Sequence, residues 1–136
     1  TWDDFQRRFE HLVGQFTPKR MSILTTVFIL TVFDYKNLLE YIKQLGFDTK
    51  QVQFGYLQDP EYLSLLSFDA QVTRPYIQDL LDSGLLGEDL TRTLKATQEQ
   101  QKSDKELHRQ FITYIKDFAQ RRTLDINIFP KELINE

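Results

Sequence analysis

Few side chains in this sequence are of the types that carry out chemistry. The 136 residues include two histidines and no cysteine, which excludes disulfides, thiolate metal sites and thiol nucleophiles. His11 and His108 each fall within a helical pattern, without a second imidazole or a carboxylate cluster at ligand spacing. We therefore interpret both as partly exposed helix residues and expect no metal site.

Acid–base and phosphate-binding sites also lack their usual sequence signals. No Asp or Glu pair falls at two predicted strand ends with a His or Lys beside it, as a general acid–base site requires. There is no phosphate-binding glycine loop, and Gly84 and Gly87 fall at a helix boundary, where glycine is typical of caps. An ordinary hydrolytic enzyme is therefore the least supported functional class.

Length, charge and hydropathy limit the remaining classes. A chain of 136 residues has room for one domain with a real core. The net charge of −3 gives no electrostatic reason to expect nucleic acid or an anionic membrane as partner. The longest apolar run, Ile23 to Phe33, is too short and too rich in threonine to span a bilayer, and no signal peptide opens the chain. We expect a cytoplasmic protein, and the start at Thr1 rather than at Met suggests a piece of a longer one.

The order of elements near the amino terminus predicts a βαβ unit of a parallel sheet. The first strand is uniformly apolar, so we expect other structure to cover both of its faces. Two strands alone cannot bury themselves in this way, which indicates one part of a larger α/β sheet or barrel. The unit consists of a strand at Met21 to Phe33, a helix at Asn37 to Leu45 and a strand at Gln51 to Leu57.

Helical patterns flank this unit on both sides. Trp2 to Phe16 is amphipathic, with an aromatic face that we interpret as packing on a sheet, the alternative being a cradle for an aromatic ligand. A helix is expected to start near Thr73 with Pro75 in its first turn. A polar helix follows at Gly87 to Gln101, and a stronger one begins at Asp104.

Two stretches of the sequence resemble a known family. The βαβ unit, which contains VFILTVFDYKNLLEYIKQLG followed by QVQFGYL, resembles the second half of the radical S-adenosylmethionine barrel, especially twitch-domain proteins. The tail, FITYIKDFAQRRTLDINIFPKEL, resembles the terminal segment of those proteins. The resemblance implies an α/β fold class, a partial parallel β/α barrel with additional C-terminal helices. Residues 1–136 would then be a single domain, the C-terminal part of a larger barrel protein.

The departures from the family pattern limit what this chain could do alone. Asp34 stands where the family usually has Asn, Thr123 where it has Gly, and Lys131 is inserted before Glu132 and Leu133. The family's three cluster cysteines belong to the missing first half of the barrel. S-adenosylmethionine and a 4Fe-4S cluster are thus implied only for a complete protein, and this chain alone is expected to hold no cluster.

The resemblance also implies two cofactor-binding residues. Asp34 would lie near the ribose or amino-acid end of S-adenosylmethionine, and Leu57 near its adenine, because ligands of parallel sheets bind at the carboxyl ends of the strands. Each residue has a simpler interpretation: Asp34 as a helix N-cap and Leu57 as part of the core. No catalytic residue is assigned.

Two functional classes therefore stay open. The first is a C-terminal segment of a radical S-adenosylmethionine enzyme, inactive until a missing N-terminal barrel half or a partner chain completes it. The second is a small interaction module without enzymatic activity, which binds a protein partner through the aromatic face of Trp2, Phe5 and Phe9 or through an open strand edge. In either class we expect self-association or partner binding.

Overall fold

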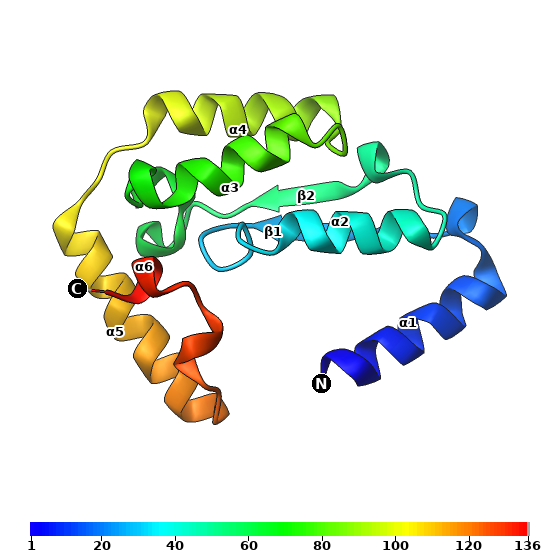
Figure 1. Ribbon diagram of the computed structural model, residues 1–136, viewed down its shortest axis with the longest axis horizontal. Helices are drawn as coiled ribbons and strands as arrows, with labels where there is room; N and C mark the ends of the chain where they lie inside the picture. Colours follow the sequence, from blue (N-terminus) through cyan, green and yellow to red (C-terminus); the bar gives the residue numbers. More distant parts are fainter. Residues whose placement is uncertain (136) are drawn as a thin grey trace.

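The computed structural model describes residues 1–135 and is mainly helical (Figure 1). Two strands, β1 and β2, form its sheet, and short 3₁₀ turns occupy several of the connections. The elements are α1 (Trp2–Phe16), β1 (Leu24–Val27), α2 (Tyr35–Gln44), β2 (Gln53–Tyr56), α3 (Ala70–Asp82), α4 (Glu88–Gln100), α5 (Lys105–Arg122) and α6 (Lys131–Ile134). Among these residues, none of the helices combines the length and the apolar character that crossing a membrane requires.

The two strands are parallel neighbours joined through α2, as the order of elements predicted. The Gln53 amide donates to the Ile23 carbonyl at 2.9 Å, and the Leu57 amide donates to the Val27 carbonyl at 3.1 Å. Leu24 pairs with Gln53 in this register, and Val27 pairs with Tyr56. The predicted βαβ unit is therefore present, although each strand is only four residues long.

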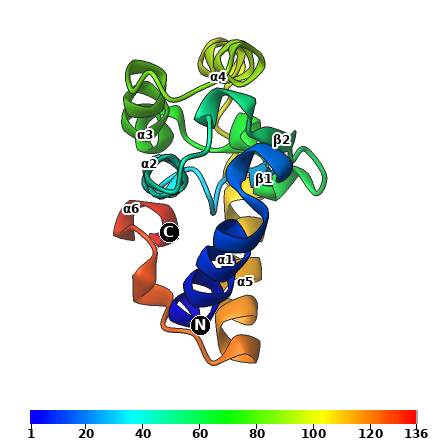
Figure 2. The ribbon, with the colours of Figure 1, turned by 90° about the vertical axis from the view of Figure 1, so that its right-hand side faces the viewer.

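Only one face of the sheet is covered. Helices α2, α3 and α4 gather on one side of the strands (Figure 2), and Val27 is buried on that side. On the opposite face the alternate residues Leu24, Thr26, Gln53 and Gly55 are all exposed. The expectation that other structure covers both faces of the first strand is wrong for this chain.

The predicted fold class, an α/β partial parallel β/α barrel, is also wrong. The described residues 1–135 form a mainly helical chain around a two-stranded sheet, with no further strand that could continue a barrel. The reason lies in the second half of the apolar run. The Thr31 hydroxyl accepts from the Phe28 amide at 3.1 Å and donates to the Thr26 carbonyl at 2.7 Å, which closes a turn at the end of β1. Ile29 and Val32 are buried, but they belong to this turn and not to a strand.

The helices after β2 complete the core. Helix α3 begins at Ala70 rather than near Thr73, because Asp69 supplies an N-cap by accepting from the Gln71 amide at 2.9 Å. Pro75 consequently lies inside the helix and not in its first turn. Helix α5 begins after Asp104, whose carboxylate accepts from the Glu106 and Leu107 amides, and it buries an apolar stripe. That stripe consists of Phe111, Ile112, Ile115 and Ala119.

Candidate functional site

Helices α1 and α2 and strand β1 line an apolar groove of about 700 Å³. Trp2, Phe5 and Phe9 form the wall from α1, and Leu38 and Ile42 form part of the wall from α2. Residues 23–26, of which all but the first belong to β1, lie between these walls. The groove therefore combines aromatic side chains, aliphatic side chains and strand backbone on one surface.

The α1 wall is a ladder of aromatic rings. Neighbouring ring centroids lie 5.4 Å apart between Trp2 and Phe5, and 5.5 Å apart between Phe5 and Phe9. Phe9 continues the ladder to Phe47, at 5.8 Å. Thr1 caps the helix by accepting from the Asp4 amide. No side chain of α1 is buried, so these ring contacts hold the helix at the edge of the molecule.

Tyr41 joins the α1 wall to α2. Its hydroxyl donates to Oε1 of Glu10 at 3.0 Å, and its ring meets the Trp2 ring edge-on at 5.6 Å. Burial and the Glu10 carboxylate together raise the pKa of Tyr41 to about 12. The phenol therefore stays neutral and able to donate throughout the physiological range.

A second tyrosine supports the floor of the groove. The hydroxyls of Tyr35 and Thr25 lie 2.7 Å apart, and Thr25 uses its own proton to donate to the Gln53 carbonyl at 3.1 Å. While Thr25 donates in this way the Tyr35 hydroxyl is the donor of the pair, and when the phenol ionises the Thr25 hydroxyl can donate to it instead. Burial raises the pKa of Tyr35, although the hydrogen bond to Thr25 opposes the shift. This pair fixes β1 to α2 below the groove.

The outer edge of β1 is free. In a parallel ladder alternate residues face the partner strand, and here Ile23, Thr25 and Val27 face β2. Leu24 and Thr26 point their backbone groups to the other edge, where the Thr26 carbonyl accepts from Thr31. Within residues 1–135, the Leu24 amide, the Leu24 carbonyl and the Thr26 amide have no hydrogen-bond partner.

The two cofactor residues implied by the family resemblance occupy different surroundings. Asp34 is exposed and lines the groove, and it occupies the N-cap position of α2, where its backbone carbonyl accepts from the Leu38 amide but its side chain caps no helix amide. Its carboxylate instead accepts from the Asn37 side-chain amide at 2.6 Å. Leu57 is half-buried against the core and does not line the groove. With no cysteine in the sequence, the residues present do not fit a 4Fe-4S cluster.

Neither histidine lines the groove. His11 is exposed, and the His108 ring lies 2.9 Å from the Asn135 carbonyl and 5.2 Å from the Phe68 ring. Nowhere in the described part of the chain do three His, Asp or Glu side chains come close enough together to hold a metal ion.

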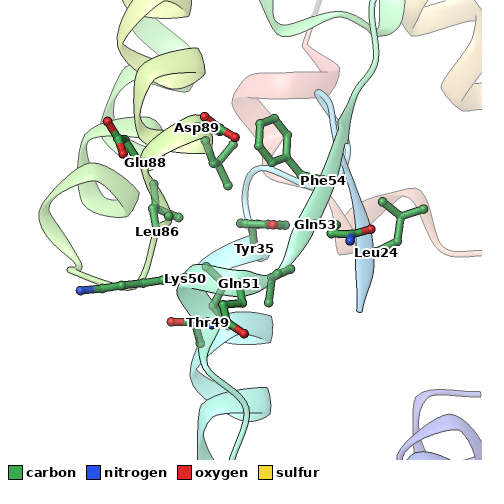
Figure 3. A pocket seen from close by; sticks show the side chains of 14 residues that line it. Leu24, Tyr35, Thr49, Lys50, Gln51, Gln53, Phe54, Leu86, Glu88 and Asp89 are labelled. Atoms are coloured by element: carbon green, nitrogen blue, oxygen red, sulfur yellow. The ribbon is translucent and has the colours of Figure 1, made fainter. Parts of the chain in front are cut away.

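A second cavity, of about 530 Å³, lies between the start of β2 and the first turn of α4. In Figure 3 the Tyr35 side chain lies between Leu86 and Gln53, and the Lys50 side chain extends away from them. Helix N-termini attract anions, but here Glu88 and Asp89 already supply negative charge, and Arg92 pairs with both. We therefore assign this cavity to packing.

Part of the groove could not be found from sequence. The aromatic face of α1 was visible in the spacing of Trp2, Phe5 and Phe9, and the open strand edge was expected for any short sheet. The role of Tyr41 was missed, because nothing local indicates that it contacts Glu10, 31 residues away. Asp34 was singled out by resemblance, and the structure places it at the groove.

Comparisons of this chain with protein-family models, with curated proteins and with solved structures give no match. Only the chemistry and geometry of the groove therefore bear on the function.

Proposed function

We propose that this chain is a protein-interaction module whose binding surface is the groove between α1, β1 and α2. The observation that supports the proposal is the exposure of the aromatic wall. Trp2 is 53% exposed and Phe5 50% exposed, although both border a groove large enough to hold apolar side chains of another protein. Leu24 at the strand edge is 73% exposed. Contiguous exposed apolar residues of this kind mark interaction surfaces.

The energies favour an apolar segment that covers several of these side chains at once. A large aromatic side chain buries about 150–250 Å², so covering the exposed half of one ring removes on the order of 100 Å² from water. At about 25 cal/mol per Å² this contributes roughly 2.5 kcal/mol per ring. Association itself costs about 4 kcal/mol or more, so one ring is not enough. A partner that covers Trp2, Phe5 and Leu24 together gains several times the contribution of one ring, which exceeds the lower end of that cost.

The radical S-adenosylmethionine interpretation remains a separate proposal that no observation on the groove favours. This interpretation requires three cysteine thiolates to hold the cluster, and this chain has no cysteine, so another segment or chain must supply them. Anaerobic reconstitution with iron and sulfide, followed by an assay for deoxyadenosine, tests it. We expect neither cluster nor turnover from the purified chain, and a stoichiometric cluster would contradict that expectation.

The module proposal is tested by selecting displayed ten-residue random peptides on the purified chain. Affinities of the selected peptides are then measured from the fluorescence of Trp2, the one tryptophan of the sequence. Phe5→Asp should weaken the selected peptides at least about tenfold, because a buried unpaired carboxylate is unfavourable. Leu124→Asp is the matched control, since Leu124 is 43% exposed and lies outside the groove.

Two results would contradict the proposal. One is a selection that yields no peptide above background. The other is a set of peptides that bind wild type, Phe5→Asp and Leu124→Asp equally well, because such peptides would not occupy the groove.

A further inference from the structure

We infer that the groove takes an extended peptide that adds to the free edge of β1 as a third strand and places a Lys or Arg beside Asp34. This inference rests on the proposed function and specifies its ligand. It follows from the unpaired backbone groups of β1 and from the distribution of charge along the groove.

The backbone of β1 offers a short ladder. The Leu24 amide, the Leu24 carbonyl and the Thr26 amide face the groove side of the strand without partners in the described chain. An extended segment beside β1 can satisfy all three, as in other cases of strand addition to a sheet edge. A helical ligand would leave them unpaired beneath its apolar face, at the cost of an unsatisfied buried donor or acceptor.

The side chains of the groove then select an alternating segment. Every second residue of an added strand points to the same face, so one set can contact the rings of Trp2 and Phe5. The other set points to the side on which Leu24 and Thr26 are exposed. Valine and threonine in alternation fit this arrangement, because both favour extended backbone.

The charge preference comes from Asp34. Among the described residues that line the groove, Asp34 is the only one that is an Asp, Glu, Lys, Arg or His. Within residues 1–135 its carboxylate forms no ion pair, and the polar contact of that carboxylate is the one with the Asn37 side chain. Lys131 lines the neighbouring cavity with Asp34 but does not pair with it. A Lys or Arg at the end of the peptide that lies beside Asp34 could therefore pair with the Asp34 carboxylate without displacing another cation.

The test uses a blocked synthetic heptapeptide, Lys-Val-Thr-Val-Thr-Val-Lys, with binding followed through Trp2 fluorescence. Two further versions are methylated at every second amide nitrogen, and the two versions differ in which of the two alternating sets carries the methyl groups. In an added strand only one of these sets faces β1. The two versions should differ in affinity at least about tenfold, because one of them loses the ladder. Equal affinities of the two methylated versions would overturn strand addition while leaving the module proposal intact.

The role of Asp34 is tested by charge reversal. Wild type should prefer the peptide with terminal Lys to its counterpart with terminal Glu by about threefold, as exposed ion pairs do. Asp34→Lys should reverse this preference, whereas Glu40→Lys, which makes the same change of charge on α2 outside the groove, should keep it. An unchanged preference in Asp34→Lys would overturn the assignment. Reversal of a preference is not a result that misfolding produces.

A second copy of the chain is the competing occupant. Sedimentation of the free protein distinguishes it from a peptide. A stable dimer that protects Trp2 from quenching and that the heptapeptide does not dissociate would overturn the proposal. If no peptide binds and Phe5→Asp changes nothing in the random selection, the proposed function itself is wrong.

Discussion

The Tyr41 hydroxyl donates to the Glu10 carboxylate across 31 residues of sequence, and this contact connects the two helical walls of the groove. Helix α1 buries none of its own side chains, so its position depends on a few such contacts at its edge. Thr17, at the end of α1, has a φ of 62°, which threonine rarely adopts, and it turns the chain toward β1. The width of the groove therefore depends on how firmly α1 is held.

Replacing Tyr41 by Phe should loosen α1 without unfolding the protein. The substitution removes the hydrogen bond to Glu10, worth about 1 kcal/mol, and keeps the ring that contacts Trp2. Amide hydrogen exchange should become faster in α1, by roughly fivefold, and stay unchanged in α5. Equal exchange in wild type and Tyr41→Phe would mean that this bond does not hold α1.

The same pair predicts a stability change at high pH. The pKa of Tyr41 is about 12 when folded, against 10.0 for the free phenol. Between these values the unfolded chain binds fewer protons than the folded one, so the free energy of unfolding falls as pH rises. Glu10→Gln removes a carboxylate that raises the pKa and should bring it back toward 10.0. Phenolate absorbance measures this, and Glu40→Gln serves as the control. A Tyr41 pKa that is the same in Glu10→Gln as in wild type would contradict this account.

Thr31 should matter more for stability than its exposure suggests. Thr31→Val keeps the shape of the side chain but leaves the Phe28 amide and the Thr26 carbonyl without their partner. We expect a loss of about 1–3 kcal/mol in the free energy of unfolding, measured with urea. Thr113→Val is the control, since its exposed hydroxyl only donates back to the Arg109 carbonyl of its own helix. Similar losses in both variants would contradict the role of the Thr31 turn.

Two glycines should respond to alanine with opposite signs. A Cβ at Gly87 would lie 2.4 Å from the Lys50 carbonyl oxygen, so the backbone must shift. Gly87→Ala should therefore destabilise the fold by about 1–3 kcal/mol, as overpacking does. Gly14 lies inside α1 with open space around it, and Gly14→Ala should stabilise that helix by about 0.5–1 kcal/mol. Thermal unfolding of the two variants checks both, and a stabilising Gly87→Ala would contradict the close approach.

The sequence allowed the local elements to be predicted better than their assembly. The spacing of Trp2, Phe5 and Phe9 predicted α1, and the order of elements predicted the parallel pair of strands. The apolar run after Ile23 predicted a long strand inside a barrel. The prediction of a long strand was wrong because the Thr31 hydroxyl closes a turn that buries Ile29 without extending the sheet.

The site was predictable to a similar extent. An aromatic helix face and an open strand edge could be proposed from sequence, because both follow from local pattern. That they border the same groove depends on where α1 packs. Its position comes from the contacts of Phe9 with Phe47 and of Tyr41 with Glu10, which have no local signature.

The most direct test of the groove as a binding surface is a two-dimensional amide NMR titration with a peptide selected on the wild-type chain. We expect the largest shift changes at the Trp2 indole and at the Phe5, Leu24 and Thr26 amides, with few changes around Lys50 and Asp89 beside the second cavity. Shift changes that centre on Lys50 and Asp89, or that spread evenly over the chain, would contradict the account.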